Sequence, residues 1–164
     1  MVVRVNPARR LSTGSYATDV IEWGKSNIME EAKKKKILVV DDEESARKPL
    51  VEELKFQNFV VHEAVNGEEG LKLAMREKPD LILLDIAMPK MTGLDVIREL
   101  RKDSWGRHVP VIFITQLPAD DLVMKQIILS EPSYYLMKND WKIEDVMEKV
   151  NDCLKSKAVE APTG

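Results

Sequence analysis

A run of four apolar residues that ends in an aspartate constrains the fold of this 164-residue chain more than any other feature. Residues 81–84 read Leu-Ile-Leu-Leu, Asp85 follows them, and Pro79 and Pro89 flank the run. A continuous apolar run between turn residues is typical of a strand that is buried on both faces of a parallel sheet. Such a strand would deliver Asp85 at its carboxyl end, where open α/β sheets place their ligand sites.

From residue 36 onward, extended and helical patterns alternate along the chain. Besides residues 81–84, extended runs occur at 37–40, 59–63, 111–114 and 134–137. After each run, apolar residues recur at spacings typical of one buried helix face. The predicted faces contain Ala46, Leu50 and Leu54; Leu71, Ala74 and Met75; Leu94, Ile97 and Leu100; Leu122, Ile127 and Ile128; and Ile143, Val146, Met147, Val150 and Leu154. This alternation implies right-handed crossovers and a mostly parallel sheet between two helix layers, a three-layer (βα)5 sandwich of the α/β class.

The composition of the runs predicts the order of the strands in the sheet. The first, third and fourth runs are purely apolar and should be central, whereas the second and fifth contain polar residues and should form the edges. The strand order 2-1-3-4-5 of flavodoxin-like folds satisfies this pattern and places a switch point between the first and third strands. Five polar residues follow carboxyl ends of strands and should share one crevice: Asp41, Asp42, Asp85, Thr115 and Lys138.

These five residues predict a chemistry for the crevice. Three carboxylates repel one another unless positive charge compensates them, and both Lys138 and a divalent cation could do so. Oxygen ligands favour Mg²⁺, and the pattern places no histidine or cysteine nearby that would suggest zinc. With Mg²⁺ and Lys138 neutralising the oxygens of an incoming phosphoryl group, and Thr115 hydrogen-bonded to one of them, Asp85 could accept that group as an acyl phosphate.

Five spaced motifs in this order resemble the receiver domain of two-component response regulators, over roughly residues 36–155. The motifs are residues 36–42, residues 81–85, the Met-Pro-Lys-Met-Thr-Gly run at 88–93, Thr115, and the Tyr-Leu-Met-Lys run at 135–138. The resemblance implies a phosphorelay protein that receives a phosphoryl group from a sensor histidine kinase or a phosphotransfer protein.

The resemblance also implies a role for each site residue. Asp85 would be the phosphoacceptor, and Lys138 would hold the oxygens of the phosphoryl group. Asp42 and the backbone carbonyl of Ala87 would bind Mg²⁺ together with Asp85, while Asp41 would lie nearby and act through water.

By the same resemblance, Thr115 and Tyr135 would form the switch. The threonine hydroxyl would move toward the phosphoryl group, and the tyrosine ring would turn inward into the vacated space. The change would be read on a face built from the fourth helix, the fifth strand and the fifth helix, where phosphorylation shifts an existing equilibrium.

Three positions depart from the usual pattern of the family. Asn139 follows Lys138 in place of a proline, so we predict a trans peptide bond there, because a cis bond before a residue other than proline costs about 3 kcal/mol. Gln116 replaces a small residue after Thr115 and could crowd access to the phosphoryl group. Residues 131–133, Glu-Pro-Ser, replace a glycine-alanine turn.

Composition and the chain ends narrow the class of protein further. Residues 1–35 read as a disordered basic leader, with Met29 as an alternative true start, and residues 156–164 read as a flexible tail. The single cysteine excludes an intramolecular disulfide, and no apolar run approaches the roughly 20 residues that span a bilayer. The net charge of −3 does not favour nucleic acid. We expect a soluble cytoplasmic protein with no membrane insertion and no direct DNA binding.

The leading hypothesis is a signalling module without its own output domain, which binds a downstream protein and could form a phosphorylation-dependent homodimer. It would be a regulatory phosphoacceptor and not an enzyme, apart from its own phosphorylation and dephosphorylation. A degenerate receiver that acts as a constitutive protein-binding module is an alternative. A Mg²⁺-dependent phosphohydrolase with an aspartyl-phosphate intermediate is disfavoured, because Ala87 stands where such enzymes place a second aspartate.

Overall fold

The computed structural model describes residues 34–116 and 121–159. The expectations for residues 1–33, including a start at Met29, and for residues 160–164 lie outside this range. The division of the chain into a leader, a receiver region and a tail therefore stays a prediction.

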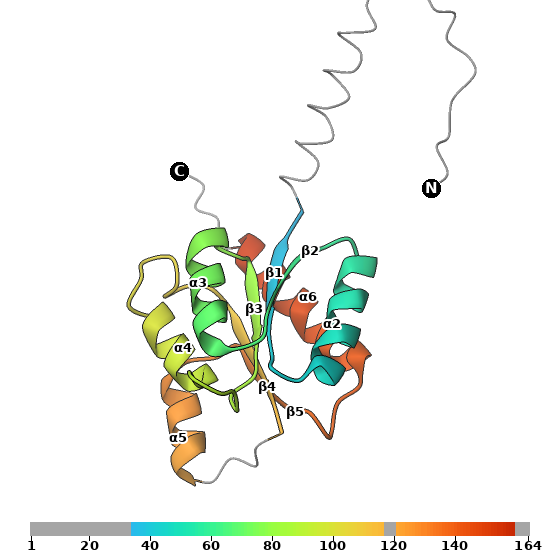
Figure 1. Ribbon diagram of the computed structural model, residues 1–164. Helices are drawn as coiled ribbons and strands as arrows, with labels where there is room; N and C mark the ends of the chain where they lie inside the picture. Colours follow the sequence, from blue (N-terminus) through green and yellow to red (C-terminus); the bar gives the residue numbers. More distant parts are fainter. Residues whose placement is uncertain (1–33, 117–120, 160–164) are drawn as a thin grey trace, which may run out of the picture. The chain divides into compact units, whose positions relative to one another are not determined.

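The described residues form a five-stranded parallel sheet whose strands alternate with helices (Figure 1). The strands are β1 (Lys36–Val40), β2 (Val60–Ala64), β3 (Leu81–Leu84), β4 (Val111–Thr115) and β5 (Tyr134–Met137). The helices are α2 (Glu44–Phe56), α3 (Gly67–Glu77), α4 (Gly93–Leu100), α5 (Asp121–Leu129) and α6 (Ile143–Val159). The order β2-β1-β3-β4-β5 confirms the predicted flavodoxin-like fold. Strand β2 begins and ends one residue later than predicted.

Burial explains why the composition of the strands predicted their order. The residues of β3 and β4 are all buried, and β1 is buried after Lys36, as expected for central strands between helix layers. All four residues of β5 are only partly buried, and β2 buries fully only Ala64. These two strands lie at the edges of the sheet, where polar side chains can reach water.

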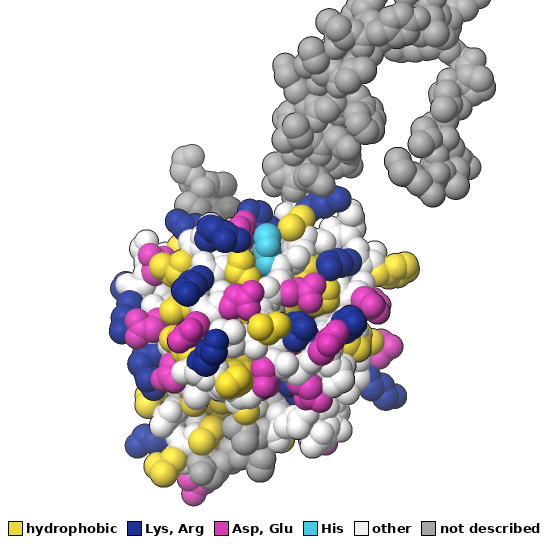
Figure 2. All heavy atoms as spheres, in the orientation of Figure 1, with side chains coloured by type: hydrophobic (Ala, Val, Ile, Leu, Met, Phe, Trp, Pro, Cys, Tyr) yellow, Lys and Arg dark blue, Asp and Glu magenta, His cyan; other side chains and the backbone are white. Residues whose placement is uncertain are grey.

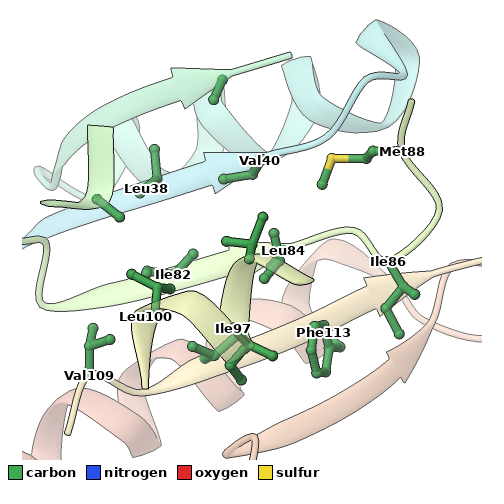
Figure 3. Packing of buried hydrophobic residues seen from close by; sticks show 14 of the residues in the cluster. Leu38, Val40, Ile82, Leu84, Ile86, Met88, Ile97, Leu100, Val109 and Phe113 are labelled. Atoms are coloured by element: carbon green, nitrogen blue, oxygen red, sulfur yellow. The ribbon is translucent and has the colours of Figure 1, made fainter. Parts of the chain in front are cut away.

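The helices cover both faces of the sheet and divide the core into two clusters. Alternate residues of one strand point to opposite faces, so Leu38 and Val40 of β1 pack on one side and Ile37 and Val39 on the other. The first cluster includes residues of α3, α4 and α5, such as Ile97 and Leu100 of α4 (Figure 3). The second cluster packs α2 and α6 against the opposite face.

Two of the predicted helix faces were partly wrong. Met75 on α3 is 40% exposed, and Leu122 and Ile128 on α5 are 73% and 66% exposed. Only Ile127 of α5 is buried. Helix α5 is apolar at most of its positions, so its sequence does not define a single stripe that must face the sheet.

No helix within residues 34–116 and 121–159 combines the length and the apolar character that crossing a bilayer requires.

Candidate functional site

The carboxyl ends of the strands bring the predicted acidic residues together. Asp41 follows β1 and Asp85 follows β3, and these two strands are neighbours with Val40 opposite Leu84. One carboxylate oxygen from each of Asp41, Asp42 and Asp85 lies within 4.8 Å of the other two. Asp41 and Asp85 are buried, whereas Asp42 is exposed, so the cluster opens to solvent on one side.

Backbone hydrogen bonds continue the sheet past the strand ends and hold the two buried aspartates. The Asp85 N–H donates to the carbonyl of Val40 at 2.9 Å, and the Asp41 N–H donates to the carbonyl of Ala64 at 3.1 Å. The positions of both carboxylates therefore follow from the parallel register of β1 with β2 and β3.

Lys138 reaches the acidic cluster from the end of β5. Its Nζ lies 2.7 Å from Oδ2 of Asp41 and 3.1 Å from Oδ2 of Asp85, and only 6% of its side chain is exposed. Its backbone N–H donates to the carbonyl of Thr115 at 2.8 Å, which fixes the start of the loop after β5. None of the described residues has a cis peptide bond, so the trans bond predicted before Asn139 is confirmed.

Burial and charge act in opposite directions on the ionisable groups of the site. Burial raises the pKa of Asp41, and the hydrogen bonds from Lys138 and from the Glu43 N–H offset this effect only in part. Burial lowers the pKa of Lys138, but the hydrogen bonds and charges of Asp41 and Asp85 outweigh it, so the pKa is raised. Lys138 therefore stays an ammonium. One ammonium cannot balance three clustered carboxylates, and a divalent cation with oxygen ligands would complete the balance.

The loop after β3 holds the Ala87 backbone at the site and depends on a glycine. The Ala87 N–H donates to Oδ1 of Asp85 at 3.2 Å. The Gly93 N–H donates to the Ile86 carbonyl at 3.0 Å. A Cβ at Gly93 would lie only 2.2 Å from the carbonyl oxygen of Asp85, so no other residue fits without a shift of the backbone. This glycine belongs to the motif at residues 88–93, but its place in the sequence did not indicate this role.

The two predicted switch residues lie beside the cluster, on β4 and β5. Thr115 is completely buried at the end of β4. Tyr135 pairs with Phe113 across the sheet, packs against the first core cluster, and places its hydroxyl 3.0 Å from Sδ of Met137. Burial raises the pKa of Tyr135, so the phenol stays neutral. The switching roles of both residues stay predictions.

Two residues of the β1–α2 region contact the site and were missed by the sequence analysis. The Arg47 guanidinium donates to the carbonyl of Asp41 at 2.8 Å from the first turns of α2. The Glu43 N–H donates to Oδ1 of Asp41 at 2.9 Å, and the Glu43 carboxylate accepts from the Gln116 side chain at 2.8 Å. Glu43 stands directly after the aspartate pair, which was an available signal. Nothing in the sequence indicated that Arg47 turns toward the strand end.

Comparison with known proteins identifies one family over most of the chain. The protein-family model described as "Response regulator receiver domain" matches residues 37–151. Among curated proteins, the chain is similar to Protein PilH of Pseudomonas aeruginosa, with 41% identity over 66 residues that cover 40% of this chain and 54% of PilH. It is also similar to Response regulator MprA of Mycobacterium leprae, with 31% identity over 112 residues, 68% of this chain and 47% of MprA.

Solved structures show the same similarity. A response regulator receiver domain protein (CheY-like) from Methanospirillum hungatei superposes with a TM-score of 0.73 at 26% identity, covering 79% of this chain and all of that one. The receiver domain of a Francisella response regulator gives a TM-score of 0.67 at 25% identity, covering 76% and 99%. The matched stretch spans only 15% to 54% of the length of the curated relatives.

Proposed function

This chain belongs to the response regulator receiver domain family, and on that premise we propose that it is a phosphorylation-activated signalling domain with Asp85 as its phosphoacceptor. One observation carries the proposal. The Asp85 carboxylate is buried beside the Lys138 ammonium, at 3.1 Å, and within a cluster of three carboxylates that suits a divalent cation. An ammonium beside a buried aspartate can neutralise the oxygens of a phosphoryl group that the aspartate accepts.

The phosphoryl group would come from the phosphohistidine of a sensor histidine kinase or a phosphotransfer protein. A carboxylate oxygen of Asp85 would attack the phosphorus, and the P–N bond would break with its electron pair leaving on the imidazole, which then takes a proton. Lys138 would contact the transferred oxygens and neutralise part of their charge. The Ala87 N–H, which donates to Oδ1 of Asp85, holds the carboxylate in one orientation.

The residues present fit a Mg²⁺ ion. Asp42 and Asp85 with the backbone carbonyl of Ala87 would hold it, and Asp41 would lie nearby and act through water. When bound, the ion supplies positive charge for the oxygens of the transferred group. The exposed side of Asp42 leaves room for the water ligands that Mg²⁺ usually keeps.

Phosphorylation would move Thr115 and Tyr135, and this conformational change would alter the face of α5, β5 and α6. Helix α5 supports this assignment, because Leu122, Ile128 and Leu129 are exposed apolar side chains of the kind that a protein partner buries. Figure 2 shows hydrophobic side chains over this helix. A downstream protein, or a second copy of the chain after phosphorylation, would bind there.

We place the protein in the cytoplasm, where a histidine kinase would deliver the phosphoryl group, without insertion into a membrane. Direct DNA binding is not part of the proposal. On the face shown in Figure 2, basic and acidic side chains are interspersed, which does not favour a polyanion.

A degenerate receiver that binds its partner constitutively is the second candidate. The contact between Gln116 and Glu43 favours it, since the same Glu43 oxygen lies 3.8 Å from Nζ of Lys138 and would compete with a phosphoryl group for the ammonium. A phosphohydrolase would require an acid or base at the exposed position of Ala87, which an alanine cannot supply.

Intact mass spectrometry after incubation with acetyl phosphate and Mg²⁺ tests the proposal. We expect wild type to gain one phosphoryl group, Asp85→Asn to gain none, and the remote control Asp152→Asn on α6 to behave as wild type. Chelation of Mg²⁺ should abolish the gain. A wild type that gains nothing while it remains folded would contradict the phosphoacceptor function and favour the degenerate receiver.

A further inference from the structure

The Glu43 carboxylate is held at the mouth of the site by two side chains. The Gln116 Nε2 donates to Oε2 of Glu43 at 2.8 Å, and the Ser45 hydroxyl donates to Oε1 at 2.7 Å. Gln116 follows β4 and Glu43 lies between β1 and α2, so their hydrogen bond links two loops that are distant in sequence. An exposed carboxylate with two neutral donors is fixed in one position, whereas a carboxylate without them would turn freely into water.

The position in which Glu43 is fixed is close to Lys138. Oε2, the same oxygen that accepts from Gln116, lies 3.8 Å from Nζ of Lys138. The same ammonium contacts Oδ2 of Asp85 at 3.1 Å. Glu43 and the proposed phosphoacceptor therefore interact with the same ammonium group.

A phosphoryl group that arrives at Asp85 needs the Lys138 ammonium for its own oxygens. Glu43 already interacts with that ammonium and, as a fixed anion, repels an incoming phosphoryl dianion. Because 46% of the Glu43 side chain is exposed, it can turn into solvent, but Oε2 can leave Lys138 only when it gives up the hydrogen bond from Gln116. That hydrogen bond therefore opposes phosphoryl entry.

We propose that Glu43 and Gln116 form an electrostatic gate that slows phosphorylation of Asp85, with Gln116 as the residue that positions the Glu43 charge. The inference rests on the proposed phosphoacceptor function and adds a control on its rate. With acetyl phosphate, a carboxylate oxygen of Asp85 forms the new bond to phosphorus, and acetate leaves with the electrons of the broken P–O bond. The gate acts before this step, on the approach of the donor.

A double-mutant cycle tests the gate. Glu43→Gln keeps the shape of the side chain and removes its charge, while Gln116→Ala removes the donor that positions it. We expect each variant to be phosphorylated about three- to tenfold faster than wild type at low salt, as for the loss of one partly exposed like charge. The double variant should be no faster than Glu43→Gln, because both changes remove the same obstacle.

The chain offers a matched control pair outside the site. Gln57, the C-cap residue of α2, donates to Glu53 of that helix at the same distance of 2.8 Å, so Glu53→Gln and Gln57→Ala should leave the rate unchanged. Ionic strength gives a second measurement, independent of side-chain size. Added salt should accelerate wild type relative to Glu43→Gln, since it screens the repulsion that the variant no longer has.

The other possible outcomes separate a failure of the gate from a failure of the proposed function. Faster phosphorylation of Gln116→Ala alone would show steric crowding by Gln116 and overturn the electrostatic gate. A slower Glu43→Gln would assign Glu43 to metal or donor binding and overturn it as well, as would additive effects of the two changes. Uptake by wild type with equal rates in all variants would contradict only the gate, whereas no uptake by wild type would contradict the proposed function and the gate together.

Discussion

At the scale of single residues, Lys138 carries a buried positive charge that contacts two buried carboxylates. The ammonium compensates both carboxylates, so its removal leaves Asp41 and Asp85 without a counter-ion in a low-dielectric environment. An exposed ion pair of equal length experiences no such penalty, since water solvates both groups. The chain contains both kinds of pair, which allows a direct comparison.

We predict that Lys138→Met lowers the free energy of unfolding by about 3 kcal/mol at neutral pH, because Asp41 and Asp85 lose their counter-ion. Urea denaturation measures the change. Mg²⁺ should restore part of the loss. Lys48→Met is the control, since Lys48 pairs with Glu44 at 2.7 Å on the surface of α2 and should contribute less than about 1 kcal/mol. Equal losses in the two variants would contradict the role of burial at Lys138.

At the scale of elements, the start of α4 supports the loop that carries the site. The Thr92 side chain accepts from the Asp95 N–H at 3.2 Å as the N-cap, and its hydroxyl donates to Oδ2 of Asp95 at 2.6 Å. Gly93 follows directly and lies against the backbone of Asp85. The cap of this helix and the position of Asp85 therefore depend on adjacent residues.

We predict that Thr92→Val destabilises the protein by about 1 kcal/mol at neutral pH, as is usual for a lost N-cap. The Thr92 hydroxyl, more than any other group, lowers the pKa of Asp95. A lowered pKa contributes stability above the unfolded-state value, and this contribution is lost as the pH falls through the folded-state value. Urea curves at several pH values should therefore show wild type and variant converging in acid. A difference that grows in acid would refute this account.

At the scale of the whole molecule, the site joins β5 to two strands of the sheet, β1 and β3, that are not its neighbours. Asp41, Asp85 and Lys138 come from the ends of β1, β3 and β5, so a ligand held among them links one edge strand of the sheet to its centre. Anything that binds the folded arrangement and not the unfolded chain stabilises the whole domain by mass action.

We predict that Mg²⁺ raises the free energy of unfolding, by about 1.4 kcal/mol at a concentration ten times its dissociation constant. Thermal or urea unfolding with and without the ion measures the shift. Asp42→Asn should reduce it strongly, and Glu44→Gln, which removes an acidic charge of α2 that pairs with Lys48, should not. An equal shift in all three proteins, or the same shift with Na⁺ at matched ionic strength, would show nonspecific screening.

Much of the fold and the site could be predicted from local sequence patterns. The apolar runs and their polar content indicated which strands are central, because a buried strand cannot carry polar side chains without partners. In a parallel sheet the carboxyl ends of all strands meet at one edge, so Asp41, Asp85, Thr115 and Lys138 could be grouped before any distance was measured. The pattern of α5 was less informative, since its apolar residues surround the helix and only Ile127 among them proved to be buried.

The sequence by itself determined the strand order, which follows from the polar content of the extended runs, and the charges of the site, which follow from the residues at the ends of those runs. Only the tertiary structure decided how those charges are arranged. The hydrogen bond from Gln116 to Glu43 depends on two loops that meet after the sheet has formed, and the contact of Arg47 with the Asp41 carbonyl depends on how α2 follows β1. Contacts between side chains far apart in sequence leave no periodic signal, and for that reason the gate at the mouth of the site emerged only from the folded chain.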